Sequence, residues 1–200
     1  MKIRYITIER EYGSGGTKIA EEAAKRCGIP CYGREILEAV AKEHHISPEE
    51  LENYEEKVSG SFLYSMFVVS QSQTGDPDLL SWEAKLLVAE ARKIRLLAQN
   101  GPAVFVGHSA GEALKDCDGV LRVFIHADDA SKHSRIIEDY HIPAPQVDSA
   151  CSRINKRRAN YYSFCTKKKW NDLRNYDVVL DSSRLGIDGC AAALSALYAE

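Results

Sequence analysis

A glycine-rich loop near the amino terminus has the residue types of a phosphate-binding site. Residues 11–17 read Glu-Tyr-Gly-Ser-Gly-Gly-Thr and lie between an alternating apolar segment and a segment with helical spacing. Closely spaced glycines let consecutive backbone N–H groups converge on an anion, and the helix N-terminus behind them favours negative charge. The predicted phosphate ligands are the backbone groups of Gly13, Ser14, Gly15 and Gly16. A strand-to-helix turn that binds nothing is the alternative.

The side chains around this loop differ from the usual phosphate-binding motif, G-x-x-x-x-G-K-[ST]. Arg10 occupies the position of the first glycine, and Gly16 occupies that of the lysine. Thr17 remains at the position of the hydroxyl that reaches Mg²⁺, which makes it the candidate metal ligand. Arg10 and Lys18 are close enough in the chain to supply the missing positive charge.

The second candidate is a basic segment in the C-terminal half of the chain. Residues 153–169 contain seven basic side chains and no acidic one, so the rest of the chain has 19 basic residues (26 less 7) against 29 acidic ones. On a helix Arg153, Lys156 and Arg157 would share one face, with Arg158 beside it. Arginines around a migrating phosphoryl group would stabilise the charge on its oxygens. A solvated helix face, or a face that lies on RNA phosphates, is the alternative.

One histidine is singled out by its position. His108 follows Val106-Gly107, directly after an apolar run of buried-strand length. Ligands bind at the carboxyl ends of the strands in an open parallel sheet, which makes His108 a candidate site residue. The other histidines lack metal-ligand spacing, and the six scattered cysteines contain no C-x-x-C pair. We therefore expect neither a metal cluster nor a disulfide.

Short apolar strands alternate with helices along the chain and would position these residues. The predicted strands are 3–8, 103–106, 120–125 and 178–180, and the predicted helices are about 17–27, 34–44, 81–99, 128–140 and from 186 onward. Between them we expect a helix start at 47–50, a helix at 59–73 whose apolar cluster at 62–68 is core rather than a dimer contact, and a loop at 74–77. This alternation is typical of a parallel sheet with helices on both faces.

Composition excludes several other classes of protein. The chain has 200 residues, 44% of them hydrophobic, and a formal charge of −3. These values suit one α/β domain and rule out a disordered tail, a coiled coil or a general nucleic-acid coat. No apolar run approaches the roughly eighteen residues of a membrane span. Six free thiols would suit a reducing compartment, and we expect a cytoplasmic location.

Several stretches together resemble the cytidylate kinase-like family, a branch of the P-loop nucleoside-monophosphate kinases. They are residues 8–16 (IEREYGSGG), 124–127 (FIHA), 156–162 (KRRANYY), 170–172 (WND) and 176–186 (YDVVLDSSRLG). The resemblance spans about residues 3–190 and is weak between about 45 and 100. It implies a three-layer α/β/α fold of the P-loop NTPase type, with a short parallel sheet, as one domain over residues 1–200.

The resemblance also implies how the site is divided. A helical region at about 34–100 would hold the nucleoside monophosphate, and a basic lid would lie at about 145–172. ATP phosphates would contact residues 13–18, with Mg²⁺ near Thr17. The implied catalytic residues are Lys18, Arg153, Arg157 and Arg158, and the implied acceptor-binding residues are Arg34, His108 and Asp172.

The favoured function is transfer of the γ-phosphoryl group from ATP and Mg²⁺ to a nucleoside monophosphate, CMP or dCMP. His108 stands where the family usually has arginine, and Gly33 stands where it usually has an acid. These departures keep two alternatives open: a nucleotide- or RNA-binding regulator with little turnover, and a kinase for another small acceptor. The expected partners are nucleotide substrates rather than nucleic acid or membranes, and a homodimer is left open.

Overall fold

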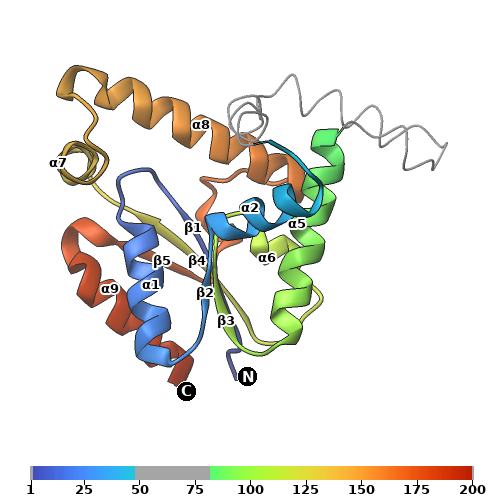
Figure 1. The fold of residues 1–200 in the computed structure, drawn as a ribbon. Coiled ribbons are helices and arrows are strands. Elements are labelled where there is room, and N and C mark those ends of the chain that lie inside the picture. Colours follow the sequence, from blue (N-terminus) through green and yellow to red (C-terminus); the bar gives the residue numbers. More distant parts are fainter. Residues whose placement is uncertain (1, 48–81, 200) are drawn as a thin grey trace.

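A five-stranded parallel sheet forms the centre of the molecule. The computed structural model describes residues 2–47 and 82–199, and for residues 82–85 it describes the backbone only. The sheet has the order β2-β3-β1-β4-β5 (Figure 1). Its strands are β1 (Tyr5–Arg10), β2 (Cys31–Tyr32), β3 (Ala103–Val106), β4 (Val120–His126) and β5 (Val178–Asp181). The four predicted strands are confirmed, and β1 continues two residues further than its apolar pattern.

Seven helices and two 3₁₀ turns connect and cover the strands within the described residues. They are α1 (Gly16–Cys27), α2 (Arg34–Glu43), α5 (Trp82–Gln99), α6 (Ala110–Ala113), α7 (Asp129–Tyr140), η2 (Ala144–Gln146), α8 (Val147–Thr166), η3 (Leu173–Asn175) and α9 (Ser182–Ala199). The helix expected from residue 186 begins instead at Ser182 and bends at Gly186, whose φ is 67° and ψ 176°. The elements expected between Pro48 and Pro77 lie outside the described residues.

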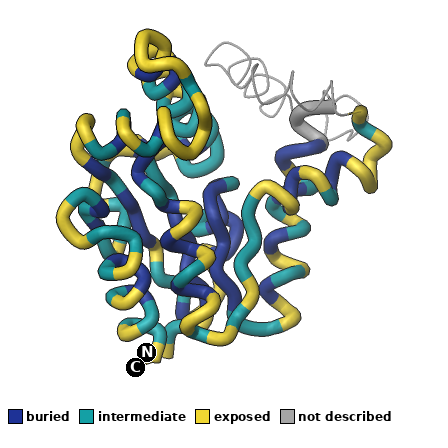
Figure 2. Tube along the Cα trace, turned by 60° about the vertical axis from the view of Figure 1, so that its left-hand side comes forward, coloured by how far each residue is buried: buried dark blue, intermediate teal, exposed yellow. Residues whose placement is uncertain are grey.

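Helices lie on both faces of the sheet, as the alternation of strands and helices predicts. Alternate residues of β1 point to opposite faces: Ile6 and Ile8 pack among α1 and α9, whereas Tyr5 packs among α5 and α6. The two hydrophobic clusters bury the middle of the sheet, which Figure 2 shows as buried chain. The architecture is therefore three-layer α/β/α. None of the described helices combines the length and the apolar character needed to cross a membrane.

Because the strands are parallel, their carboxyl ends all lie at one edge of the sheet. At this edge β1 leads into the glycine loop, and β3 leads into Gly107 and His108. Helix α8 crosses above the same edge, and the chain termini lie at the opposite end of the molecule (Figure 1). The two segments that the sequence indicates as candidates for phosphate binding, the glycine loop and the basic segment, thus lie on the same side of the molecule.

Candidate active site

The glycine loop is shaped by two residues in the left-handed backbone region. Gly13 has a φ of 76° and Gly15 a φ of 74°, values that favour glycine. A Cβ atom on Gly13 would lie 2.9 Å from the Ile136 side chain and the Lys132 carbonyl oxygen, so space as well as backbone conformation requires glycine there. Gly15 is the N-cap of α1. The loop therefore delivers the chain directly to a helix N-terminus, whose first N–H groups have no partner within the helix.

Side chains of α7 and α9 donate hydrogen bonds to carbonyl oxygens of the loop. Arg135 Nη1 donates to the Gly13 carbonyl at 3.3 Å and to Ser182 Oγ at 3.0 Å. Ser182 Oγ donates in turn to the Ser14 carbonyl at 2.6 Å. Because the C=O and N–H of a trans peptide point in opposite directions, the Gly15 N–H is directed away from Ser182. The hydrogen bond from Ser182 to the Ser14 carbonyl thus fixes the direction in which the Gly15 N–H points.

Arg10 and Gly16, the two positions that differ from the phosphate-binding motif, lie against each other in the structure. A Cβ atom on Gly16 would lie 2.6 Å from Arg10 Cβ and 2.8 Å from Arg10 Cγ. The Arg10 side chain continues to Gly107, where its Nη1 takes the space that a Cβ would need. The side chain that the motif places on the helix is therefore replaced by one from the end of β1, and a positive charge is retained beside the loop.

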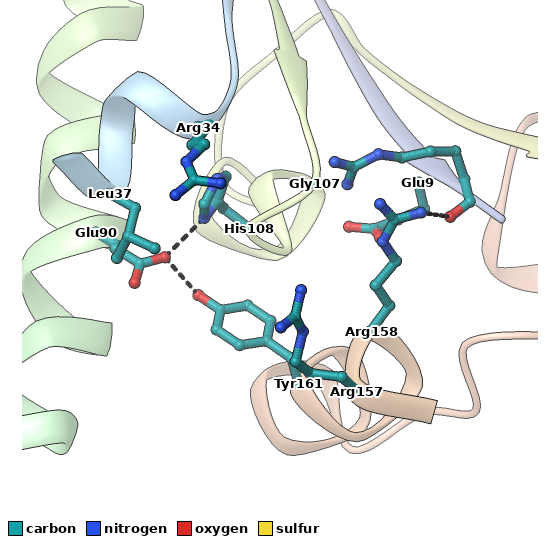
Figure 3. Close-up of a pocket in the computed structure, with 10 residues that line it drawn as sticks. Glu9, Arg34, Leu37, Glu90, Gly107, His108, Arg157, Arg158 and Tyr161 are labelled. Carbon is teal, nitrogen blue, oxygen red and sulfur yellow. Dashed lines mark hydrogen bonds and ion pairs between the residues drawn. The ribbon is translucent and has the colours of Figure 1, made fainter. Parts of the chain in front are cut away.

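A cavity of about 230 Å³ opens next to Arg10 at the carboxyl edge of the sheet (Figure 3). It is lined by Glu9, Arg10, Arg34, Leu37, Glu90, Gly107, His108, Arg157, Arg158 and Tyr161. These residues come from β1, α2, α5, the segment after β3, and α8. The basic helix α8 thus supplies one wall, and Arg158 Nη1 donates to the Arg10 carbonyl at 3.0 Å.

Positive charge exceeds negative charge around this cavity. Four guanidinium groups line it, against the two carboxyl groups of Glu9 and Glu90 among the described residues. Burial, together with the neighbouring Arg10 guanidinium, lowers the pKa of Arg158 to about 9. Arg10 Nε is buried without a hydrogen-bond partner in the part of the chain that the structure describes. An anion in the cavity would relieve the repulsion and accept hydrogen bonds from these groups.

Glu9 is a half-buried residue whose carboxyl group lines the cavity. Burial raises its pKa, and the adjacent Arg10 opposes that shift. Trp170 Nε1 donates a hydrogen bond of 3.1 Å to Glu9 Oε2. Glu9 therefore offsets part of the arginine charge while its position is fixed by a residue beyond the end of α8.

The other carboxyl group of the cavity, Glu90, is buried and links three elements. Its side chain is 1% exposed, and its Oε2 lies 2.8 Å from His108 Nδ1. The Tyr161 hydroxyl donates to the same oxygen at 2.9 Å (Figure 3). Glu90 on α5 thus connects the segment after β3 with helix α8, and it holds the imidazole at the wall of the cavity.

Several of the site residues predicted from the sequence come together here. Arg34, His108, Arg157 and Arg158 line the cavity, although they lie far apart in the chain. Gly13 to Gly16 form the loop at the start of α1. Thr17 lies exposed in the first turn of that helix, beside the loop.

Three other predicted residues do not line the cavity. Lys18 Nζ lies 2.7 Å from Asp139 Oδ1 of α7, so its charge is directed to the side of the molecule. Hydrogen bonds from Arg174 lower the pKa of Asp172 to about 2, and Arg174 Nη2 lies 2.8 Å from Asp172 Oδ2. Arg153 lies on the exposed side of α8. Any role of these residues in transfer would need a different arrangement of the chain.

Glu9, Glu90 and Tyr161 line the cavity, and none of them is predicted from the sequence to have a role in the site. For Glu90 the sequence does contain a signal, because it lies on the apolar stripe of α5. Leu86 and Ile94, four residues before and after it, are both buried. A carboxyl group at such a position needs a polar partner inside the protein, which is a reason to search for a site.

Comparisons with known proteins identify the family of the chain. The family model described as the cytidylate kinase-like family matches residues 5–184. A cytidylate kinase from Methanococcus vannielii is 28% identical over 191 residues, which cover 92% of this chain and 93% of that protein. The resemblance noted in the sequence is thereby confirmed.

Solved structures show the same fold at low identity. An uncharacterized protein from Eubacterium ventriosum has a TM-score of 0.73 at 23% identity and covers 100% of this chain and 99% of that one. Shikimate kinase from Bacteroides thetaiotaomicron has a TM-score of 0.54 at 12% identity, with 98% of both chains covered. A gluconokinase from Sinorhizobium meliloti has a TM-score of 0.52 at 15% identity, with 100% and 94% covered. The fold is thus that of the P-loop kinases, and the protein, a kinase for a nucleotide or another small molecule, belongs to the cytidylate kinase-like family.

Proposed function

We propose that the protein transfers the γ-phosphoryl group of ATP to a nucleoside monophosphate, CMP or dCMP, with Mg²⁺ as cofactor. The observation that carries the proposal is the arginine-lined cavity next to the glycine loop. Among the residues that the structure describes, four guanidinium groups and two carboxyl groups line the cavity, which is an excess of positive charge. A phosphate dianion would neutralise this excess, and the 28% identical cytidylate kinase supports cytidine nucleotides as the class to test first.

In this proposal the glycine loop holds the donor. Backbone N–H groups of Gly13, Gly15 and Gly16 at the N-terminus of α1 would bind the ATP phosphates. The Ser14 N–H, which the sequence also predicts as a phosphate ligand, instead donates to the Glu11 carbonyl at 3.2 Å. Mg²⁺ takes phosphate oxygens and waters as most of its ligands, so one protein hydroxyl is enough to fit the site. Thr17 supplies that hydroxyl, because it is exposed in the first turn of α1. When bound, the ion would neutralise charge on the phosphate oxygens.

The arginines would act on the group in transfer. Phosphoryl transfer spreads negative charge over the transferring oxygens, and positioned cations stabilise that charge. Arg10 and Arg158 lie nearest the loop, Arg157 follows on α8, and Arg34 and His108 would bind the acceptor phosphate from the other wall. No general base is needed for this acceptor, because an oxygen of a nucleoside monophosphate is already ionised near neutral pH.

The proposal includes a cytoplasmic location. All six cysteines of the chain are free thiols, and free thiols persist in a reducing compartment. ATP and nucleoside monophosphates would be the small-molecule partners.

Steady-state kinetics with ATP and a panel of CMP, dCMP, UMP, AMP and GMP test the function. We expect one of the cytidine nucleotides to be the best acceptor. The double variant Arg157→Ala/Arg158→Ala should lower kcat by roughly 100-fold or more, because it removes cations that face the transferring group. Lys156→Ala, which removes an exposed charge from the same helix, is the matched control and should leave kcat unchanged.

Two results would contradict the proposal. One is that no monophosphate gives turnover above that of the double variant. The other is that ATP binds tightly, as calorimetry would show, while no acceptor is phosphorylated. The second result would favour the regulator that the sequence leaves open.

A further inference from the structure

The imidazole of His108 lies between a buried carboxyl group and the arginine-lined cavity. Its Nδ1 is 2.8 Å from Glu90 Oε2, and its side chain is 16% exposed. Gly107, His108 and Ser109 have φ values of 74°, 54° and 47°, so three consecutive residues adopt the left-handed region. Such a run is costly for residues with a side chain and is typical of functional sites. The backbone therefore directs this side chain to a defined place at the cavity wall.

The contact with Glu90 determines which ring nitrogen is left for a ligand. A carboxylate accepts a hydrogen bond, so the proton of a neutral His108 lies on Nδ1. Nε2 makes no hydrogen bond to any residue in the described ranges. As long as the imidazole is neutral, Nε2 is an acceptor, and it would repel the oxygens of a phosphate.

The charges around His108 oppose one another while the cavity holds no anion. The Glu90 carboxyl group on α5 faces Nδ1 of the ring at 2.8 Å. The guanidinium groups of Arg34 on α2, Arg10 on β1, and Arg157 and Arg158 on α8 line the same cavity, and Arg34 Nε is paired with Glu38 Oε1 of α2 at 3.0 Å. The remaining titratable groups that line the cavity are Glu9 on β1 and Tyr161 on α8, and Tyr161 donates its hydroxyl to Glu90.

A phosphate dianion would reverse this balance. Its two negative charges would offset the guanidinium groups, and its oxygens would accept a hydrogen bond from a protonated Nε2. Histidine is the side chain whose charge changes most readily between pH 5 and 8, so a modest change in its surroundings is enough. The arginines have no such freedom, because they stay charged throughout this range.

We propose that His108 takes up a proton from solvent on Nε2 when a phosphate dianion binds in this cavity, and that the resulting imidazolium becomes a phosphate ligand beside the arginines. The Nδ1 proton stays in the hydrogen bond to Glu90, so the ring gains one proton and one positive charge. The inference rests on the proposed function in one respect, the placing of the acceptor phosphate in this cavity. It makes acceptor binding depend on pH through one named residue.

Calorimetric titration with CMP at pH 7.5 measures the proton uptake directly. At this pH CMP is almost entirely the dianion, and titrations in two buffers with different ionisation enthalpies give the number of protons taken up. We expect the wild-type protein to take up between about half a proton and one proton per CMP bound. His108→Gln should reduce that uptake to near zero and weaken binding about tenfold.

Two further variants separate this role from a purely structural one. His108→Arg supplies a permanent cation, so it should bind CMP without proton uptake. Glu90→Gln removes the charge that favours the imidazolium, so it should lower the uptake while His108 is still present. Equal uptake in the wild-type protein and His108→Gln would overturn the inference. So would zero uptake in the wild-type protein, a result that does not depend on any variant being folded.

The same titration with inorganic phosphate separates this inference from the proposed function. If CMP is neither bound nor phosphorylated, but phosphate binding still draws a proton that His108→Gln does not take up, the nucleotide assignment fails and the role of His108 stands. If CMP is phosphorylated with equal proton uptake in the two proteins, the role of His108 fails and the kinase assignment stands.

Discussion

The Arg10 side chain fills the space that a side chain at position 16 would need, and this explains why a P-loop protein can lack the usual lysine. Position 16 begins α1, and its Cβ would lie 2.6 Å from Arg10 Cβ. Real Cβ atoms do not approach another carbon so closely, so one of the two positions must be glycine. The cation is kept, and it now comes from the end of β1 and points to the cavity.

Substitution of Gly16 by alanine tests this account of the two positions. Gly16→Ala should lower the free energy of unfolding by about 1–3 kcal/mol, because the new methyl group must displace the Arg10 stem. This result would run against helix propensity, which favours alanine over glycine. Gly189→Ala in α9, whose Cβ would make an ordinary contact of 3.4 Å, is the matched control and should be neutral or stabilising. Urea denaturation measures both.

A double-mutant cycle assigns the cost to Arg10. In an Arg10→Gly background the volume is empty, so Gly16→Ala should cost less than about 0.5 kcal/mol. If Gly16→Ala is as harmless as Gly189→Ala in the wild-type background, the shared-volume account is wrong.

At the level of single elements, helix α7 packs against the glycine loop and donates a hydrogen bond to it. Its Arg135 holds the Gly13 carbonyl, and its Ile136 packs where a Gly13 side chain would be. The helix begins after Asp128, whose Oδ1 accepts a hydrogen bond of 2.7 Å from the Ser131 N–H. The stability of this helix start therefore bears on the shape of the loop.

Removal of the cap should destabilise the protein in a manner that depends on pH. Asp128→Ala should lower Tm by about 2–4 °C at pH 7, which is the effect of an average cap in a protein of this size. The backbone hydrogen bond from Ser131 lowers the pKa of Asp128. A carboxyl group with a lowered folded-state pKa stabilises fully above its ordinary value near pH 4, and the contribution is lost as pH falls through the folded-state pKa.

The control for this prediction is Asp128→Asn, which keeps an acceptor for the Ser131 N–H but cannot ionise. The difference in Tm between the wild-type protein and Asp128→Asn should be constant from pH 5 to 7 and disappear toward pH 3. A difference that grows as the pH is lowered would have the wrong sign for this cap.

Most of the elements could be predicted from the sequence, because their apolar patterns are local. Strand β3 (Ala103–Val106) and helix α7 agree with their predicted ranges to within one residue. Strand β2 has only two residues, Cys31 and Tyr32, which is too few for a pattern. The sequence predicts that the last helix begins at Gly186, but α9 begins at Ser182. The positive φ of Gly186 marks a bend inside the helical segment rather than its beginning.

The site was harder to predict than the elements, because it depends on contacts between distant segments. Arg157 and Arg158 could be found from the density of basic residues. Lys18 has the same charge and lies next to the loop in the chain, but its position on α1 directs it to Asp139. The neighbouring sequence does not distinguish Lys18 from Arg157 and Arg158, because the direction of a side chain is set by the packing of the helix that carries it. The partners of Glu90 are likewise 18 and 71 residues away along the chain.

At the scale of the whole molecule, the fold gathers positive charge that the chain as a whole does not have. The formal charge is −3, yet in the described part of the chain four arginines from β1, α2 and α8 line the cavity at the carboxyl edge of the sheet. An anionic substrate that completes the site would offset the repulsion between these groups. The central claim is therefore that donor and acceptor phosphates meet at this cavity, between the glycine loop and α8.

A bisubstrate analogue tests that claim most directly. The analogue consists of cytidine and adenosine joined 5′ to 5′ through five phosphates, and calorimetry would measure its dissociation constant. The account predicts that it binds the wild-type protein more tightly than CMP or ATP alone, that Arg157→Ala/Arg158→Ala weakens it by roughly 100-fold, and that Lys156→Ala leaves it unchanged. An analogue that binds no better than the single nucleotides, or equally well to the double arginine variant, would contradict the account.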